Sequence, residues 1–245
     1  MATAKDIHVA PISQKDAATL VKRVHYSGKI VNNSQLHFGV FLNNKLEGVM
    51  SFGASLDKRK TQKLVTETAW NDFLELNRMA FSEALPRNSE SRALSIAFKL
   101  IKKHYPHIEW IISFADGTQC GDGTIYRASG FVLTGIKKNT AIIKLEDGTI
   151  AADVTFSKSH HILKTGGKAS RPKGSELLKG FQIRYVYFLN PNAKERLTVP
   201  ILPFSKIDEM GASMYKGVSI KRVTKASFGD QSERGGAVPT DTLQS

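Results

Sequence analysis

The chain has 245 residues, a net charge of +13 and 41% hydrophobic residues, a composition that fits a folded protein with a substantial core in one or two domains. No run approaches the roughly 18 apolar residues of a membrane-spanning helix, and the first residues lack the apolar segment of a secretory signal. A single cysteine, Cys120, excludes an internal disulfide. These features predict a cytoplasmic protein without a membrane partner.

The positive charge is unevenly distributed along the chain. Residues 158–225 hold 14 Lys and Arg against 4 Asp and Glu, whereas the last twenty residues are slightly acidic. A concentrated basic region favours a polyanionic partner such as nucleic acid. A second basic run, residues 57–63, is interpreted either as solvated surface or, if it lies beside a site, as a phosphate contact.

The N-terminal part is predicted to be a helix followed by a β-hairpin. Ser13 is a suitable N-cap for a helix that ends near Val24, because apolar residues recur there at helical spacing. His25 comes next and is interpreted either as a cap that interacts with the helix dipole or as a functional residue. Residues 36–42 and 46–52 are predicted strands joined by a tight turn.

Residues 73–135 predict a βαβ unit around which the rest of the chain is organised. Residues 74–81 form a strand whose regular alternation places Arg78 and Glu75 on opposite faces. A helix opens near Asn88 and leads to a second strand at residues 110–115, a short apolar run typical of a buried parallel sheet. The crossover between the two strands is expected to be right-handed.

The carboxyl ends of these two strands predict a ligand site, since ligands bind there in open α/β sheets. Residues 87–92 form the turn and the first helical turn at this edge. Their free backbone N–H groups and the positive end of the helix dipole suit a phosphate. Arg87 and Arg92 are expected to add charge-assisted hydrogen bonds.

Four single residues lie near this edge, and three of them have more than one interpretation. Asp116 directly follows the second strand and is either a turn residue or a proton acceptor. Tyr126 is either a proton donor or an ordinary packing residue. Arg78 is a charge in a largely buried strand, so it needs a partner, which is Glu75, a carboxylate across the sheet or a bound cofactor. Cys120 lacks an activating neighbour in the sequence and is not predicted to be a nucleophile.

The C-terminal part is predicted to be β-rich. Residues 132–133 and 141–145 are predicted to form a hairpin with its turn at residues 137–139, and residues 181–189 form a strand with alternating aromatic residues. The Gly, Ser and Lys content of residues 157–175 predicts mobility. Three units are expected: a catalytic core at residues 1–156, a basic extension that packs on it at 157–227, and a disordered tail at 228–245.

The succession of strand, phosphate-binding turn, helix, strand and Tyr-x-x-x-Gly-Phe resembles the core of the GNAT acyl-CoA transferases. The resemblance implies an α/β (α+β) fold in which helices flank a mixed central sheet. It also implies acetyl-CoA or another acyl-CoA as cofactor, with Tyr126 near its sulfur. The turn here lacks the paired glycines of most GNAT enzymes. The residues expected to bind the cofactor are Arg78, Arg87, Asn88, Ser89, Ser91 and Arg92.

A closer resemblance is to the Mom family of phage DNA-modification proteins. It is carried, in chain order, by HYSG at 25–28, LHFGVF at 36–41, SFG at 51–53, LELNRM at 74–79, NSESR at 88–92 and SFADGTQCGDGTIYRASGF at 113–131. The resemblance implies an enzyme that adds an acetamido-type group to N6 of adenine in double-stranded phage DNA. That modification protects the DNA from host restriction enzymes. The C-terminal basic extension is then expected to contact the DNA.

The chemistry of adenine narrows the choice of site residues. The N6 lone pair is delocalised into the ring, so N6 is a poor nucleophile that needs a group to accept its proton as the new bond forms. The enzyme must also reach a base that is stacked in a duplex, either by flipping it or by using single strands. The predicted catalytic residues are His25, Tyr26, Asp116 and Tyr126. The resemblance also raises iron as a second cofactor, with His25, Tyr26 and Asp116 as its ligands.

Two other functions are compatible with the sequence. One is a GNAT-fold N-acetyltransferase that acts on a protein or a small amine and is basic for unrelated reasons. The other is a DNA-binding protein that retains an inactive transferase fold. The oligomeric state is left open, with a dimer as one option.

Overall fold

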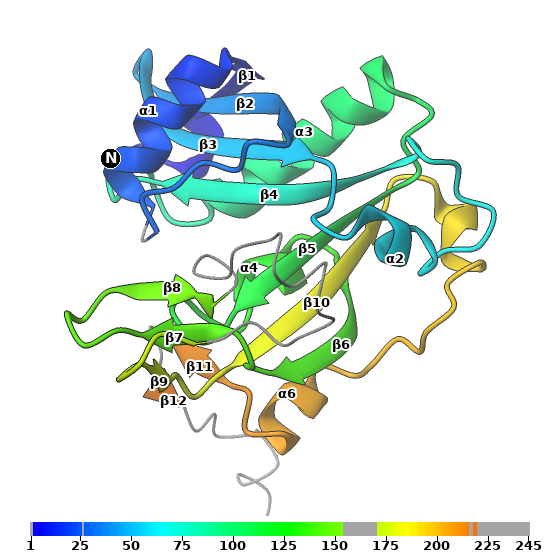
Figure 1. Ribbon diagram of the computed structural model, residues 1–245. Coiled ribbons are helices and arrows are strands. Elements are labelled where there is room, and N and C mark those ends of the chain that lie inside the picture. Colours follow the sequence, from blue (N-terminus) through cyan, green and yellow to red (C-terminus); the bar gives the residue numbers. More distant parts are fainter. Residues whose placement is uncertain (1, 26, 154–170, 216–217, 220–245) are drawn as a thin grey trace, which may run out of the picture.

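The computed structural model describes residues 2–25, 27–153, 171–215 and 218–219. A seven-stranded sheet in the order β1-β2-β3-β4-β5-β10-β6 runs through the molecule (Figure 1). Its strands are antiparallel except for the parallel pair β4 and β5. This mixed sheet confirms the predicted fold class. The bounds are β1 (His8–Pro11), β2 (Ser34–Leu42), β3 (Lys45–Gly53), β4 (Phe73–Phe81), β5 (Trp110–Asp116), β6 (Val132–Lys138) and β10 (Phe181–Phe188).

Two long helices cover opposite faces of the first half of this sheet (Figure 1). Helix α1 (Gln14–Val24) begins at the predicted N-cap, where the Ser13 hydroxyl accepts a hydrogen bond from the Asp16 N–H at 3.1 Å. Its apolar stripe packs on Val49 and Ala80 of the sheet. The shorter helices are η1 (Ala4–Asp6), α2 (Lys58–Gln62), α4 (Thr124–Ala128), η3 (Pro191–Lys194) and α6 (Ser205–Glu209).

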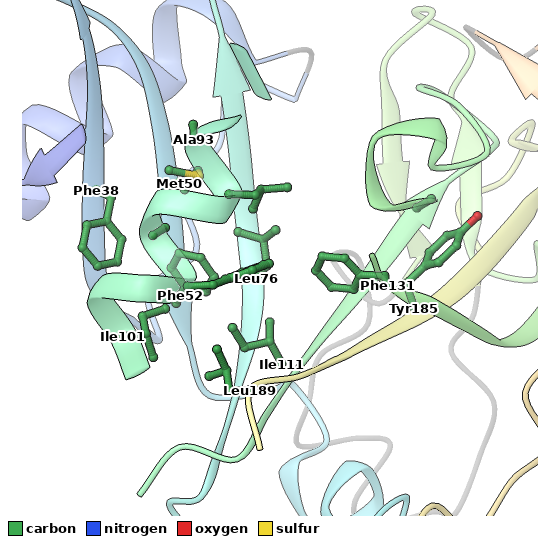
Figure 2. Packing of buried hydrophobic residues seen from close by; sticks show 14 of the residues in the cluster. Phe38, Met50, Phe52, Leu76, Ala93, Ile101, Ile111, Phe131, Tyr185 and Leu189 are labelled. Carbon is green, nitrogen blue, oxygen red and sulfur yellow. The ribbon is translucent and has the colours of Figure 1, made fainter. Parts of the chain in front are cut away.

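Helix α3 (Ser89–His104) forms the main core with the other face of the sheet. In Figure 2, Met50 and Phe52 from β3 point toward Ala93 and Ile101 of α3. The buried side chains of α3 recur at helical spacing, which explains why this segment is a helix and why it lies flat on the strands. The sequence β4, α3, β5 is the predicted βαβ unit, which is therefore confirmed.

A second, three-stranded sheet in the order β8-β7-β9 is separate from the central one. It consists of β7 (Ile142–Lys144), β8 (Ile150–Ala152) and β9 (Glu176–Leu177). The predicted hairpin between residues 132–133 and 141–145 is wrong, because β6 pairs with β10 whereas β7 pairs with β8 and β9. The remaining strands, β11 (Met214–Tyr215) and β12 (Val218–Ser219), pair with each other.

The predicted strand at residues 181–189 is confirmed as β10, and it lies between β5 and β6. A strand from beyond residue 156 therefore completes the central sheet, while the predicted division into units at 1–156 and 157–227 stays a prediction. The predicted tail at 228–245 and most of the segment at 157–175 lie outside the described residues. Within the part of the chain that the structure describes, none of the helices combines the length and apolar character needed to cross a membrane.

Candidate active site

A divergence between β4 and β5 creates the site. The two strands are in register at only three pairs, Phe73 with Trp110, Leu74 with Ile111 and Glu75 with Ile112. Beyond Glu75, β4 continues beside β3 and β5 continues beside β10. The carboxyl-terminal halves of two neighbouring strands are thus separated inside the sheet, which opens space where ligands of α/β proteins bind.

A β-bulge in β4 sets the direction of the side chains at this opening. Ser51 of β3 lies opposite Arg78, but its neighbour Phe52 lies opposite Leu76, so Asn77 is the extra residue. Asn77 is buried, accepts a hydrogen bond from the Ser34 hydroxyl at 3.0 Å and donates one to the Ala54 carbonyl at 3.3 Å. The bulge interrupts the alternation of the strand.

The bulge makes one sequence prediction wrong. Regular alternation placed Glu75 and Arg78 on opposite faces, whereas both line the same cavity. The cavity has a volume of about 750 Å³, which lies in the usual range for ligand sites. Its wall contains more basic than acidic side chains, namely Lys29, Arg78, Lys137 and Lys138 against Glu75 and Asp116. This excess of positive charge suits an anionic ligand or polyanion.

Glu75 is the functional candidate that the sequence analysis treated only as a partner of Arg78. Burial raises the pKa of its carboxyl above the ordinary 4.5. Hydrogen bonds from the Ser55 and Asn77 side chains, the charge of Arg78 and the Leu56 backbone N–H oppose that rise. Glu75 is therefore a fixed carboxyl group in a cavity, with its pKa shifted toward the range in which a carboxylate accepts protons effectively. The sequence did contain a signal for Glu75 as a functional residue, since it is an acidic residue inside a strand that is expected to be buried.

Arg78 connects the cavity to the end of helix α1. Its Nε donates to the Lys29 carbonyl at 2.9 Å, and a terminal guanidinium nitrogen donates to the Asn77 carbonyl at 3.1 Å. These bonds hold the loop after α1 against β4 and direct Lys29 and Ser27 to the cavity wall. Arg78 therefore positions the loop and also contributes charge to the cavity.

His25 lies at the C-cap of α1, where its backbone N–H bonds to the Val21 carbonyl. Burial and then the charge of Arg78 lower the pKa of His25 to about 4, so the ring is neutral at pH 7. The Ser27 N–H donates to Nδ1 at 3.1 Å, which leaves the proton of the neutral ring on Nε2. His25 is thus the C-cap residue of α1 and a hydrogen-bond donor beside Arg78. Its neutral ring carries no charge that would interact with the helix dipole, and its functional role stays a prediction.

Asp116 is a turn residue, which is one of its two predicted roles, while its role as proton acceptor stays a prediction. It lines the cavity, and its two carboxylate oxygens accept hydrogen bonds from the Thr118 N–H at 2.9 Å and the Gln119 side chain at 3.0 Å. The carboxylate therefore holds the turn after β5 while it lies at the cavity wall. Although Cys120 is an exposed residue, partial desolvation of its thiol and then the nearby Asp116 carboxylate raise its pKa, which disfavours the thiolate.

Tyr126 of α4 lies close to the point where β4 and β5 separate, although it does not line the cavity. Its hydroxyl hydrogen-bonds with the Ser113 side chain, which in turn donates to the Leu76 carbonyl at 3.4 Å. Burial raises the pKa of Tyr126 to about 12, so its phenol keeps its proton at neutral pH. A protonated phenol can donate a hydrogen bond, while the role of Tyr126 as a proton donor stays a prediction.

The predicted phosphate-binding turn at residues 87–92 is separate from the cavity wall in the described structure. Helix α3 begins at Ser89, and Asn88 adopts a left-handed conformation without a capping hydrogen bond from its side chain. Ser89 is fully buried, and its hydroxyl has no hydrogen-bond partner among the described residues. Arg92 lies near enough to Asp6 for their charges to interact. The exposed helix N-terminus and the unsatisfied hydroxyl fit an anion at this turn.

The structure brings together some of the predicted site residues. Arg78 and Asp116 line the cavity, and His25 and Tyr126 lie beside it. Tyr26 lies outside the described residues. Among the residues described, no three or more His, Cys, Asp or Glu side chains gather in a group that would hold a metal ion. The predicted iron site at His25, Tyr26 and Asp116 therefore gains no support from this geometry.

Comparisons with known proteins agree with the resemblance seen in the sequence. The Mom protein family matches residues 6–206. The methylcarbamoylase Mom of Escherichia phage Mu is 38% identical over 203 residues, which cover 80% of this chain and 81% of the phage Mu protein.

Two N-acetyltransferases are among the solved structures that match this chain. The ribosomal-protein-S18-alanine N-acetyltransferase of Escherichia coli matches with a TM-score of 0.43 and 13% identity, over 75% of this chain and 94% of that one. A spermidine/spermine N-acetyltransferase from Vibrio cholerae matches with a TM-score of 0.45 and 8% identity, over 79% of this chain and 99% of that one. From the family match and the identity to the phage Mu protein, the chain belongs to the Mom family.

Proposed function

We propose that this protein is a phage DNA-modification enzyme that transfers a methylcarbamoyl, or acetamido-type, group to N6 of adenine. The observation that carries the proposal is the 38% identity to the phage Mu methylcarbamoylase over four-fifths of both chains. The electropositive cavity at the divergence of β4 and β5 supports it, since a basic site suits a polyanionic substrate. The modification would act in the cytoplasm of the bacterial host and protect phage DNA from restriction.

The residues around the cavity have distinct roles in this proposal. Glu75 accepts the proton of the adenine amino group, because it lines the cavity and burial raises its pKa. Asp116 lies at the same wall and is the second candidate for that role. The neutral Nε2–H of His25 and the protonated phenol of Tyr126 serve as hydrogen-bond donors. Arg78 holds the loop from α1 in place through the Lys29 carbonyl.

An acyl-CoA cofactor is part of the proposal. Arg87, the N–H groups at the start of α3 and the unsatisfied Ser89 hydroxyl would hold its phosphates. When bound, the cofactor would supply a thioester, whose acyl carbon is activated toward an amine. Acyl transfer alone would give an N6-acetyl amide, so the amide nitrogen of the acetamido-type product has to come from a further reaction and a further donor. A test that needs no activity is isothermal titration of CoA into the wild type and into Ser89→Val, a variant in which a branched apolar side chain replaces the hydroxyl. The variant is expected to bind CoA more weakly than the wild type, and equal affinity would contradict this role of Ser89.

The direct test of DNA modification uses cells that express the protein. Mass spectrometry of nucleosides from their plasmid DNA is expected to show a heavier deoxyadenosine. Asp116→Asn is expected to lower its amount at least about tenfold, because the substitution removes the charge at the cavity wall and keeps an oxygen for the turn.

The matched control for this substitution is Asp147→Asn. Asp147 holds an equivalent turn, with its carboxylate accepting from the Thr149 N–H at 2.8 Å, but it does not line the cavity. Wild-type amounts of modified base are expected from it. Unmodified plasmid DNA from cells that contain soluble wild-type protein would contradict the proposed function.

If DNA binds at the cavity, the dependence of its affinity on salt concentration should change when the lysines of the cavity wall are replaced. Lys137 and Lys138 line the cavity, so replacing both by Ala should remove about two phosphate contacts. The slope of log affinity against log salt is then expected to become about 2 units less steep. Replacing Lys102 and Lys103, two exposed residues on α3, is the control and should leave the slope unchanged. Equal slopes for both pairs, measured by fluorescence anisotropy, would exclude a phosphate contact at the cavity.

A further inference from the structure

Leu56 is an apolar side chain in an unusual setting. It lies in the short connection between β3 and α2, and 94% of its surface is exposed, the largest fraction among the exposed large hydrophobic residues of the described chain. A single exposed leucine needs no explanation by itself. Its neighbours, however, fix it in place at the border of the active site.

The segment around Leu56 is held rigidly. Ser55 is 6% exposed, and its hydroxyl bonds to the Thr61 hydroxyl of α2 at 3.0 Å. The Ala54 carbonyl accepts hydrogen bonds from the side chains of Asn33 and Asn77. On the other side of Leu56, Asp57 is exposed but is held as the N-cap of α2, where its carboxylate accepts a hydrogen bond from the Lys60 N–H at 3.2 Å. The backbone is therefore anchored before and after Leu56, while its side chain lies in solvent. Little conformational entropy would be lost if a partner received it.

The same segment borders the cavity. Gly53, the last residue of β3, is the register partner of Glu75, and the Leu56 N–H hydrogen-bonds to the Glu75 carboxyl that lines the cavity. The chain then enters α2, on which Arg59 and Lys60 are exposed cations. Leu56 is thus an exposed apolar tip whose backbone bonds to the Glu75 carboxyl and which Asp57 separates from the cations of α2. An apolar tip next to cations is complementary to a nucleic-acid duplex, whose base stack is apolar and whose edges are anionic.

We propose that Leu56 is a wedge that enters the DNA duplex and occupies the place of the adenine that has moved into the cavity. This inference rests on the proposed function. The amino group of a paired adenine is engaged in the duplex, so a cavity of about 750 Å³ can receive it only after the base leaves the stack. Unstacking a base is unfavourable, and an apolar side chain in the vacated place stabilises the open duplex. Arg59 and Lys60 bind the phosphates on either side of the opened step.

The test reports directly on unstacking and needs no cofactor. The sequence around adenines that the wild type modifies in plasmid DNA is placed in a duplex, with 2-aminopurine at the target position. Fluorescence of 2-aminopurine rises when the base leaves the stack, and the wild type is expected to cause that rise. Leu56→Ala is expected to reduce the rise about tenfold or more, while its affinity for the duplex stays within about threefold. Leu56→Met, which keeps an apolar tip, should restore most of the rise.

Two controls separate the wedge from general effects. Ile201→Ala removes an exposed aliphatic side chain of equal size, 44% exposed and outside the cavity wall, and should behave as wild type. In a duplex where the target faces an abasic site, the base is already free of its pair, and Leu56→Ala should then match the wild type. A fluorescence rise from Leu56→Ala equal to that of the wild type in the fully paired duplex would overturn the wedge.

The amounts of modified adenine in cells distinguish a failure of the wedge proposal from a failure of the proposed function. If cells with wild-type protein contain no modified adenine, the proposed function fails. If they contain it and cells with Leu56→Ala contain the same amount, the function stands and the wedge is wrong. Loss of modified adenine in Leu56→Ala, together with wild-type amounts in Ile201→Ala, supports both.

Discussion

Replacing Glu75 by Gln is expected to lower adenine modification by about a hundredfold or more. The substitution keeps the size of the side chain and its capacity to accept a hydrogen bond, but it removes the carboxylate that takes the proton from N6, a contribution worth about 10² to 10⁴ in rate. The measurement is the initial rate of formation of modified deoxyadenosine in plasmid DNA, by mass spectrometry. A variant with at least half of the wild-type rate would rule out Glu75 as the proton acceptor.

The pH dependence distinguishes this role from a structural one. Burial raises the pKa of Glu75, so protonation of this carboxyl is easier in the folded protein than in the unfolded chain. Wild-type activity should therefore fall as the pH decreases through a pKa above 4.5, and the residual activity of Glu75→Gln should lack this step. The stabilising effect of the protonated carboxyl is present below pH 4.5 and is lost as the pH rises through the folded pKa. The uncharged Gln is thus expected to leave the protein at least as stable at neutral pH.

A matched control is Glu109→Gln. Glu109 is a partly buried carboxylate that pairs with Arg196 and does not line the cavity. This variant should lose some stability, because it breaks an ion pair, and should retain wild-type modification and the wild-type pH profile. A similar loss of modification from both variants would indicate an effect of stability instead of chemistry.

Replacing Gly53 by Ala is expected to destabilise the protein by about 3 kcal/mol. A Cβ atom at this position would lie 2.1 Å from the Asn33 carbonyl oxygen, 2.6 Å from the Ser34 Cα and 2.8 Å from the Asn77 Oδ1. Two of these atoms belong to the backbone, and Ser34 is the strand partner of Gly53, so they cannot retreat without breaking the pairing. Urea unfolding followed by circular dichroism measures the change in the free energy of unfolding.

Gly53→Ala should also reduce DNA modification in the fraction that folds, because Gly53 is the strand partner of Glu75. Gly121→Ala is the control, since its Cβ would lie 3.4 Å from the Met214 carbonyl oxygen, an ordinary contact. It should lose less than about 1 kcal/mol. If the two variants had equal free energies of unfolding, the atoms around Gly53 would be able to move away from the added Cβ, and the expected clash would be wrong.

Local patterns in the sequence are sufficient to predict most of the central fold. Helix α1, with its cap at Ser13, and the β4, α3, β5 unit each depend on contacts a few residues apart, such as capping bonds and apolar spacing. The pairing of β6 with β10 and of β7 with β9 could not be predicted in this way. It depends on contacts between distant segments, which leave no periodic signal in a single sequence.

Part of the site could also be predicted from local patterns in the sequence. Asp116 and Arg78 were identified because each is a charge at the end of, or inside, an apolar strand. Glu75 was not assigned to the site, because a regular strand turns it away from Arg78, and only the extra residue Asn77 brings the two to one cavity. A bulge is decided by the partner strand and by side chains such as Ser34, so the sequence of β4 alone does not reveal it.

The position of β10 has a consequence for how the protein is made. Strands β5 and β6 emerge from the ribosome long before residues 181–188, yet they meet only through β10. Until translation has passed that segment, each has an unpaired edge that invites association with other nascent chains. Pairing over such sequence separations is also slow. Premature termination before β10 is therefore expected to yield an aggregating fragment, so a shortened gene would not encode a smaller working enzyme.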